Sequence, residues 1–395
     1  MPKATRFQTK EHNTRLVYKT IYADTGISRA EISRKTKLTK TTVSNIVAEL
    51  VNEGLVEEIG MGISDAGKPP ILLSAVDDAR YFMGIDLANS VFRGAIVNLR
   101  GEIKYHFSQP IYNSTGDSAL KIVFQLVDDL LNASENPVRG IGIGTPGLVD
   151  PQNGVIRTSI NLDWQDLPLR DLIQKRYELS CFLANDCQAA ALGEYTFARN
   201  SSTSNLVVVK VGRGIGSGIV LNGKLHYGDG YGAGEIGHVV VVDNGERCAC
   251  GNYGCLETVA STKAIIRLAK KLAENDQKSL LYQFVSSPDE ITTECVLQAS
   301  NAGDLGVQTI ISNAGYYLGT TAAYLIGILN VQHIVFAGSV IRFGNVFMEP
   351  LKRAMQDCSM SNLSEGTKID VSSLGQDIVI MGAASLLLAN EFHLT

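Results

Sequence analysis

One short segment of the chain carries four side chains that commonly bind transition metals. In the stretch GHVVVVDNGERCACGNYGCLE, one imidazole is followed by three thiols, at His238, Cys248, Cys250 and Cys255. Three cysteines and one histidine suit tetrahedral Zn²⁺, and four protein ligands leave no open position for a substrate. The segment therefore predicts a structural zinc site.

Disulfide bonding is the alternative for these cysteines. Disulfides persist mainly in oxidising compartments, and the basic, polar start MPKATRFQTKEHNTR lacks the pattern of a secretory signal. Cys-x-Cys spacing is also poor for a mutual bridge. We therefore expect a cytoplasmic protein with reduced thiols. The other four cysteines are expected to be apolar filler: Cys181, Cys187, Cys295 and Cys358.

The N-terminal part of the chain has a positive charge that the rest does not share. Residues 1–52 carry ten Lys or Arg against four acidic residues, a balance of +6. Because the 395 residues together carry −5, the remainder carries −11. Such a basic segment suits a polyanion such as DNA, since phosphate contacts supply much of the sequence-independent affinity. A solvated basic tail is the alternative.

Three helical patterns in this basic segment have the spacing of a helix-turn-helix. A first helix is expected over residues 10–23, and Ser28 with Glu31 forms a capping-box pattern for a second. Thr39 is placed to cap a third helix. The start of that third helix is polar and basic on its outer face, as in a recognition helix that enters the major groove.

Two apolar runs extend this pattern to a winged form. LVEEIG and PPILLS are expected to be strands around the loop GMGISDAGK, with Lys68 at the tip of the wing reaching a phosphate or the minor groove. We interpret residues 1–80 as a winged helix-turn-helix that binds DNA, and a small helical domain that binds a protein is the alternative. The residues expected to contact DNA are Ser28, Arg29, Lys40, Thr41, Thr42, Ser44, Asn45 and Lys68.

The elements that must position the metal segment show an internal duplication. Residues 81–103 and 206–225 each contain an apolar strand, a turn, and a second strand that ends in an Asn-containing turn. This repeat predicts two α/β lobes that face a cleft, over 81–196 and 197–395, with the C-terminal helix free to return to the first lobe. The longest apolar stretch, 316–331, is shorter than the roughly 20 residues that span a bilayer, so no membrane partner is expected.

Several motifs together resemble the ROK family, which groups repressors, open reading frames and sugar kinases. The string GRGIGSGIVLNGKLHYGDGYGAGEIGH followed by CACGNYGCLE is similar to the family signature, and GIGTPGLVDPQNGVI and NDCQAAALGE match further segments. The winged head and the AGKPP segment resemble the repressor branch, such as xylose and N-acetylglucosamine repressors. The resemblance implies a two-lobed, actin-like (ribonuclease H-like) fold of the sugar-kinase type behind the head.

The resemblance also implies a sugar site in the cleft. Asn185 and Asp186 would lie at its mouth, where family kinases use the Asp as general base, and Glu235, His238 and Glu257 complete the set. His238 would bind zinc through one ring nitrogen and face the sugar with the other. Local alternatives exist for three of these residues: Asp186 as a helix N-cap, Glu257 as a charge near a helix N-terminus, and Glu235 as a solvated loop charge.

Two turns depart from the kinase pattern. In place of a DxGGT-like turn the chain has DLANS, where Asp86 is kept and Ser90 replaces the threonine, but Ala88 and Asn89 replace the glycines with side chains that would crowd a phosphate. In GRGIG, Arg213 stands where a small hydroxyl is expected. The resemblance therefore implies a sugar-responsive repressor of carbohydrate-metabolism genes and not an enzyme. The alternatives are a sugar kinase and a repressor controlled by a protein partner.

A repressor of this kind is expected to bind operator DNA as a homodimer or a dimer of dimers, because operators of helix-turn-helix proteins are usually palindromic. Sugar in the cleft would bias its closure and change the placement of two heads. The family favours release of DNA on sugar binding, and a sugar that acts as a corepressor is the alternative. The sequence leaves the sugar open among xylose, glucose, N-acetylglucosamine and their phosphates or oligomers.

Overall fold

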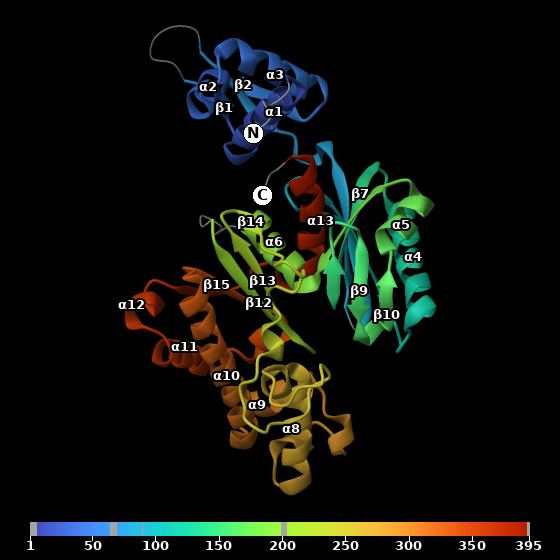
Figure 1. The fold of residues 1–395 in the computed structure, drawn as a ribbon, viewed down its shortest axis with the longest axis vertical. Helices are drawn as coiled ribbons and strands as arrows, with labels where there is room; N and C mark the ends of the chain where they lie inside the picture. The colour runs from blue at the N-terminus through green and yellow to red at the C-terminus, as the bar shows by residue number, and fades with distance from the viewer. Residues whose placement is uncertain (1–5, 64–68, 89, 199–203, 393–395) are drawn as a thin grey trace.

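The computed structural model describes residues 6–63, 69–88, 90–198 and 204–392. The N-terminal head holds three helices and a small sheet of strand order β1-β3-β2 (Figure 1). Its elements are α1 (Arg6–Ala23), β1 (Ile27–Ser28), α2 (Arg29–Thr36), α3 (Lys40–Asn52), β2 (Val56–Met61) and β3 (Ile71–Ala75). The predicted helices and both wing strands are thus present.

The caps predicted in the head are also present. The Ser28 hydroxyl accepts the Glu31 N–H at 3.3 Å, and the Glu31 carboxylate accepts the Ser28 N–H at 2.9 Å. Thr39 accepts the Thr42 N–H at 3.1 Å at the start of α3. These bonds satisfy backbone donors that a helix start leaves unpaired. Residues 64–68, with the predicted contact Lys68, lie outside the described residues.

The body contains two five-stranded sheets with the same topology. In each, the first three strands form an antiparallel meander and the next two join in parallel on the other side of the first strand. The first sheet, ordered β11-β7-β4-β5-β6, consists of β4 (Tyr81–Leu87), β5 (Val91–Asn98), β6 (Ile103–Pro110), β7 (Val138–Thr145) and β11 (Ser180–Asn185). The second, ordered β14-β13-β12-β15-β16, consists of β12 (Leu206–Val211), β13 (Ile215–Leu221), β14 (Lys224–Leu225), β15 (His333–Ala337) and β16 (Lys368–Val371).

The remaining elements cover or extend these sheets (Figure 1). Beside the first sheet lie α4 (Gly116–Ala133), α5 (Leu169–Tyr177) and a three-stranded antiparallel sheet of β8 (Leu148–Asp150), β9 (Val155–Ser159) and β10 (Trp164–Leu167). A helical group follows β14: α7 (Glu257–Ala260), α8 (Thr262–Asn275), α9 (Thr293–Asn301), α10 (Leu305–Leu329), α11 (Asn345–Asp357) and α12 (Ser361–Ser364). Among the described residues, no helix combines the length and apolarity needed to cross a membrane.

Two buried helices, α6 (Asp186–Phe197) and α13 (Ile378–Glu391), pack together and share an apolar core with strands of both sheets. They approach so closely that a Cβ on Gly382 would lie 1.7 Å from the Ala189 carbonyl oxygen. On its other side α13 packs on β4 and β7, where a Cβ on Gly142 would lie 1.8 Å from the Ala383 carbonyl oxygen. The C-terminal helix therefore packs on the first sheet, whereas the predicted domain boundaries stay a prediction.

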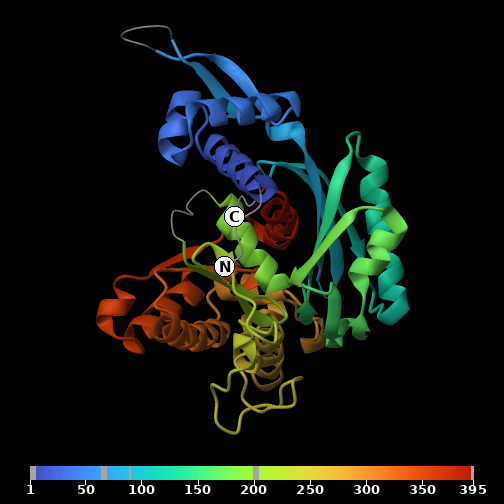
Figure 2. The ribbon, with the colours of Figure 1, turned by 45° about the horizontal axis from the view of Figure 1, so that its top comes forward.

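The head is packed directly on the body (Figures 1 and 2). Tyr18 of α1 lies with its ring centroid 4.9 Å from that of Phe392, which follows α13. The Tyr22 hydroxyl donates to the Leu99 carbonyl at 2.7 Å, and Arg100 stacks over the Tyr22 ring at 4.1 Å. The apolar core of the head thus continues without a break into that of the first sheet and α13.

Candidate functional site

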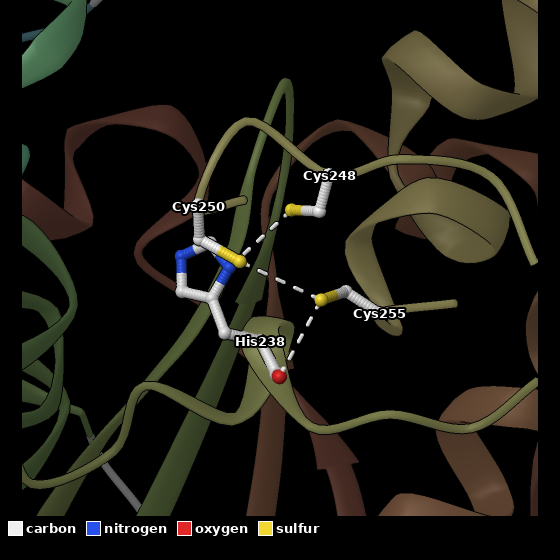
Figure 3. A group of neighbouring side chains, drawn as sticks. All are labelled: His238, Cys248, Cys250 and Cys255. Carbon is white, nitrogen blue, oxygen red and sulfur yellow. Dashed lines mark hydrogen bonds between the residues drawn. The ribbon is translucent and has the colours of Figure 1, made fainter. Parts of the chain in front are cut away.

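The four predicted metal ligands converge (Figure 3). His238 ends a short 3₁₀ turn, Cys248 and Cys250 come from the loop that follows, and Cys255 lies just before α7. Their ligand atoms all lie within 4.8 Å of one another. The segment folds back on itself through isolated bridges between Val240 and Cys255 and between Arg247 and Tyr253. The backbone therefore brings the four side chains together, and the cluster can hold a metal ion.

The spacing of these atoms fits a tetrahedral metal and excludes a disulfide in this conformation. The Cys250 and Cys255 sulfurs are 3.7 Å apart, and the Cys248 sulfur is 3.6 Å from His238 Nδ1. Bonds of about 2.3 Å to sulfur in a tetrahedron separate two sulfurs by about 3.8 Å, whereas a disulfide needs about 2.05 Å. The Asn252 N–H lowers the pKa of the Cys250 thiol, and burial raises that of Cys255 to about 12.

His238 connects this cluster to the predicted sugar-binding set. Its Nδ1 faces the sulfurs, while its Nε2 lies 3.8 Å from a carboxylate oxygen of Glu235. Glu235, Asp186 and Glu257 are near enough to interact electrostatically. The Glu257 carboxylate accepts the backbone N–H of Ile215 at 3.1 Å, so it also braces the glycine-rich turn between β12 and β13.

Asn185 and Asp186 lie where β11 meets α6. The N-cap is Asn185 and not Asp186: the Asn185 side-chain oxygen accepts the N–H groups of Cys187 and Gln188 at 2.8 and 3.3 Å. The alternative that assigned the cap to Asp186 is therefore wrong, because Asp186 already lies inside the helix. One carboxylate oxygen of Asp186 instead forms an ion pair with the Lys210 ammonium at 2.6 Å. The side chain of Asp186 is thereby available for a role beyond capping.

Two cations of this region were not among the predicted site residues. Lys210 on β12 pairs with Asp186, and Arg93 on β5 pairs with the buried Asp86 at 2.5 Å. Both lie inside apolar strands, LVVVKV and VFRGAIVN. A charged side chain within a strand whose neighbours are buried is the signal that identifies such residues, since charges enter cores only when paired.

The predicted DNA-contacting residues differ in exposure. Lys40, Thr41, Ser44 and Asn45 lie exposed on the first turns of α3, and Thr42 is half-buried with its hydroxyl 2.8 Å from that of Thr39. Arg29 reaches the surface but pairs with Glu58 of β2 at 2.8 Å. Ser28 is only 4% exposed, and its hydroxyl bonds to Glu31 at 2.7 Å. The exposed set therefore centres on the N-terminal half of α3.

The two turns that depart from the kinase pattern lie at the ends of corresponding strands. Asp86 is fully buried near the end of β4, whereas Arg213, in the turn between β12 and β13, is exposed. Asn89 lies outside the described residues. The acid of the first turn is thus built into the core, while the cation of the second faces solvent.

Comparison with known proteins identifies the class. The ROK family profile matches residues 82–390, and a profile for winged helix-turn-helix DNA-binding domains matches residues 10–57. The chain therefore belongs to the ROK family and carries a winged helix-turn-helix head. The fold class predicted from the sequence, a winged head before a two-lobed, actin-like sugar-kinase fold, is confirmed.

Similar proteins include regulators and an enzyme. A xylose repressor from Caldicellulosiruptor bescii is 32% identical over 96% of both chains. A glucokinase from Halalkalibacterium halodurans is 30% identical over 79% of this chain and 96% of its own. A solved ROK family transcriptional regulator, described as a homologue of the Escherichia coli MLC protein, has a TM-score of 0.86 and 28% identity over 98% of both chains.

Proposed function

We propose that this protein is a sugar-responsive transcriptional repressor of carbohydrate-metabolism genes, which binds operator DNA through its head and a small sugar in the cleft. Two findings support the proposal: the winged head joined to a ROK body, and the likeness to regulators over the whole chain. The observation that carries it is the shared apolar core of head and body, because a ligand in the body can then act on DNA binding.

We propose that α3 enters the major groove. Its exposed residues combine one cation with short hydroxyl and amide side chains, which suit phosphate oxygens and base edges. The proposed contacts are Arg29, Lys40, Thr41, Thr42, Ser44, Asn45 and Lys68. Ser28 is left out of this set because its hydroxyl is buried and already bonded to Glu31.

The proposed sugar contacts are Asn185, Asp186, Glu235, His238 and Glu257. A carboxylate accepts hydroxyl donors at both oxygens, so several carboxylates around one cleft can distinguish sugars by the positions of their hydroxyls. The Asn185 side chain caps α6 and donates to the Gly147 carbonyl at 3.0 Å. We therefore propose that Asn185 helps to hold the start of α6, and with it Asp186, in place beside the sugar.

We propose that the Cys₃His cluster holds a structural Zn²⁺ through His238, Cys248, Cys250 and Cys255. When bound, the ion would fix the imidazole tautomer and leave Nε2 directed at Glu235. The cluster then orients a sugar-binding residue without itself contacting the sugar.

Sugar binding reaches the head through α6 and α13 in this proposal. Asp186 begins α6, α6 packs on α13, and α13 leads to Phe392 beneath Tyr18. A shift of α6 on ligand binding would therefore move α13 and the head together, and we propose that the result is release of DNA. A ligand shifts such an equilibrium only as far as its affinities for the two states differ.

We further propose that the chain is not a kinase, acts in the cytoplasm, and binds its operator as a homodimer or a dimer of dimers. In the sequence, Ala88, Asn89 and Arg213 replace the small residues that family kinases place around ATP phosphates, and free thiols suit a reducing compartment. The glucokinase relative and the retained Asp86 and Asp186 favour kinase activity as the second candidate. Sugar-dependent ATP turnover that disappears in Asp186→Asn would establish that candidate instead.

A mobility-shift assay tests the main proposal. We expect the full chain to shift DNA from upstream of its own gene, and one sugar among D-xylose, D-glucose and N-acetylglucosamine to abolish the shift. Lys40→Ala should weaken binding and lower the salt slope by about 1, and Asn45→Ala should cost about 1–3 kcal/mol if it reads a base. Lys352→Ala, which removes one exposed charge from α11, is the matched control.

The outcomes separate the candidates. Absence of any shift contradicts the repressor proposal. A shift that no sugar affects favours control by a protein partner.

A further inference from the structure

Four charged side chains form two neighbouring ion pairs beside the proposed sugar site. Arg93 pairs with Asp86 at 2.5 Å, and Lys210 pairs with Asp186 at 2.6 Å. Lys210 also acts electrostatically on Asp86, so the two pairs are connected. All four side chains are at most 22% exposed. Two cations therefore balance two carboxylates in a place largely shielded from water.

Because Asp86 is buried, its carboxylate needs the neighbouring cations to remain charged. Burial raises the pKa of Asp86, and Lys210 and Arg93 oppose that rise. Burial alone would lower the pKa of Lys210, but the carboxylates of Asp186 and Asp86 outweigh it and hold that pKa above its ordinary value. Removing one member of a buried ion pair leaves an uncompensated charge, which is far more costly than losing an exposed one. Lys210 thus remains an ammonium ion between two acids.

One carboxylate oxygen among these four side chains accepts no hydrogen bond. The second oxygen of Asp86 is buried and has no hydrogen-bond partner in the described part of the chain. Buried carboxylate oxygens without a donor are rare, and hard divalent cations are bound by such oxygens. If the ammonium were absent, Asp86 and Asp186 would therefore offer oxygen ligands and an excess negative charge to a cation such as Mg²⁺.

Lys210 also joins the two halves of the body. It stands on β12 of the second sheet, whereas Asp186 begins the helix that follows β11 of the first sheet. The Lys210 ammonium donates a hydrogen bond to one carboxylate oxygen of Asp186, and the backbone N–H of Cys187 donates to the other at 3.0 Å. Each oxygen keeps a second lone pair, so the carboxylate is oriented and can still accept a sugar hydroxyl.

We propose that Lys210 is a positioning and specificity-determining residue of the sugar site: its ammonium is a built-in counter-ion that orients Asp186 and keeps divalent cations away from Asp86 and Asp186. The site then binds an uncharged sugar without a metal ion at this position. The inference rests on the proposed function for its sugar-binding part only, since exclusion of divalent cations can be measured with no sugar present.

The test compares full-length wild type, Lys210→Met and Lys210→Arg. Thermal shift with MgCl₂ or MnCl₂ alone measures cation binding, and titration with D-xylose, D-glucose and N-acetylglucosamine measures sugar binding. Wild type should show no Mg²⁺ response, whereas Lys210→Met should be stabilised by Mg²⁺. In Mg²⁺-free buffer the Met variant should bind the sugar at least about tenfold more weakly, as expected for a lost hydrogen bond to a charged group. Mg²⁺ or the Arg substitution should restore part of that affinity.

A control variant separates this role from a structural one. In Lys210→Met/Asp86→Asn the charge balance is restored, so this double variant should fold even if Lys210→Met does not, bind sugar weakly and ignore Mg²⁺. Wild-type sugar affinity in either Met variant overturns the proposal, and so does a loss of affinity that neither Mg²⁺ nor Arg repairs. If wild type binds none of the three sugars while Lys210→Met still gains Mg²⁺ binding, the proposed function fails and the counter-ion role stands.

Discussion

The loop that carries the Cys₃His cluster and the crossing of α6 with α13 differ in burial and in the side chains that they bring together. The segment from His238 to Leu256 exposes apolar side chains such as Val240 and Tyr253 at 50% and 58%, and it brings four candidate metal ligands together. The helix crossing is buried, and its closeness depends on the lack of a side chain at Gly382. Both regions contain glycines with no room for a side chain, but only the first also brings a set of candidate metal ligands together. Different substitutions should therefore break them.

The largest effect is expected at the helix crossing. In Gly382→Val the new side chain would collide with the Ala189 carbonyl, so α6 and α13 must separate, at a cost of more than about 4 kcal/mol. Soluble yield and urea denaturation measure it. Gly327→Ala in α10 is the control, because its Cβ meets no atom within 4 Å, and it should stabilise by about 0.5–1 kcal/mol. Equal stability of both variants would contradict the close contact.

Loss of the metal ligands should have the next largest effect. Cys255→Ser should abolish binding of one metal ion per chain and remove about 3 kcal/mol of ligand-linked stability, measured by elemental analysis and thermal shift. Proteolysis should then concentrate in residues 239–256, while the helix crossing stays protected. Cys358→Ser, at an exposed cysteine outside the cluster, should keep its metal. Unchanged metal content in Cys255→Ser would exclude the cluster as the site.

An effect of similar size on stability is expected where the crossing reaches the head. Phe392→Ala removes the ring against which Tyr18 packs and should cost about 3 kcal/mol. Because α3 is untouched, DNA should still be bound, but the proposed sugar response should fall. Chemical denaturation and the mobility-shift assay measure the two quantities. The control is Phe284→Ala, at a side chain 37% exposed. A full sugar response in Phe392→Ala would argue against transmission through α13.

The smallest effect should come from relieving the left-handed backbone conformation of a residue that is not glycine. Lys37 ends α2 with a φ of 59°, in the left-handed region that glycine adopts without strain. Lys37→Gly should therefore stabilise the head by about 0.5 kcal/mol, seen as a slightly raised denaturation midpoint. A lowered midpoint would show that the Lys37 side chain contributes a contact that outweighs the backbone strain.

The parts of the molecule that could be predicted from sequence are those set by near neighbours along the chain. The capping box of Ser28, the N-cap Thr39 and the Cys₃His cluster each depend on residues close together in the chain. The widest separation is the 17 positions from His238 to Cys255. The repeated hairpins follow from strand patterns that are each complete within one segment.

Other features required the fold. The pair between Lys210 and Asp186 forms only when β12 and α6 are brought together, and nothing near Asp186 in sequence indicates a cation. The burial of Ser28 follows from the packing of the head, which its polar side chain does not reveal. The placement of the N-cap at Asn185 depends on where β11 ends, which the neighbouring residues Asn185 and Asp186 do not decide, since both types are favoured as caps.

The contact of Tyr18 with Phe392 also bears on which property of DNA the protein can sense. Because head and body share one core, a tilt of α13 would rotate α3 as part of a rigid unit and would not be absorbed by a tether. In an assembly of two chains, such tilts change the distance between two recognition helices while each keeps the same amino acids toward its groove. The state of the cleft would then select operators by the number of base pairs between half-sites.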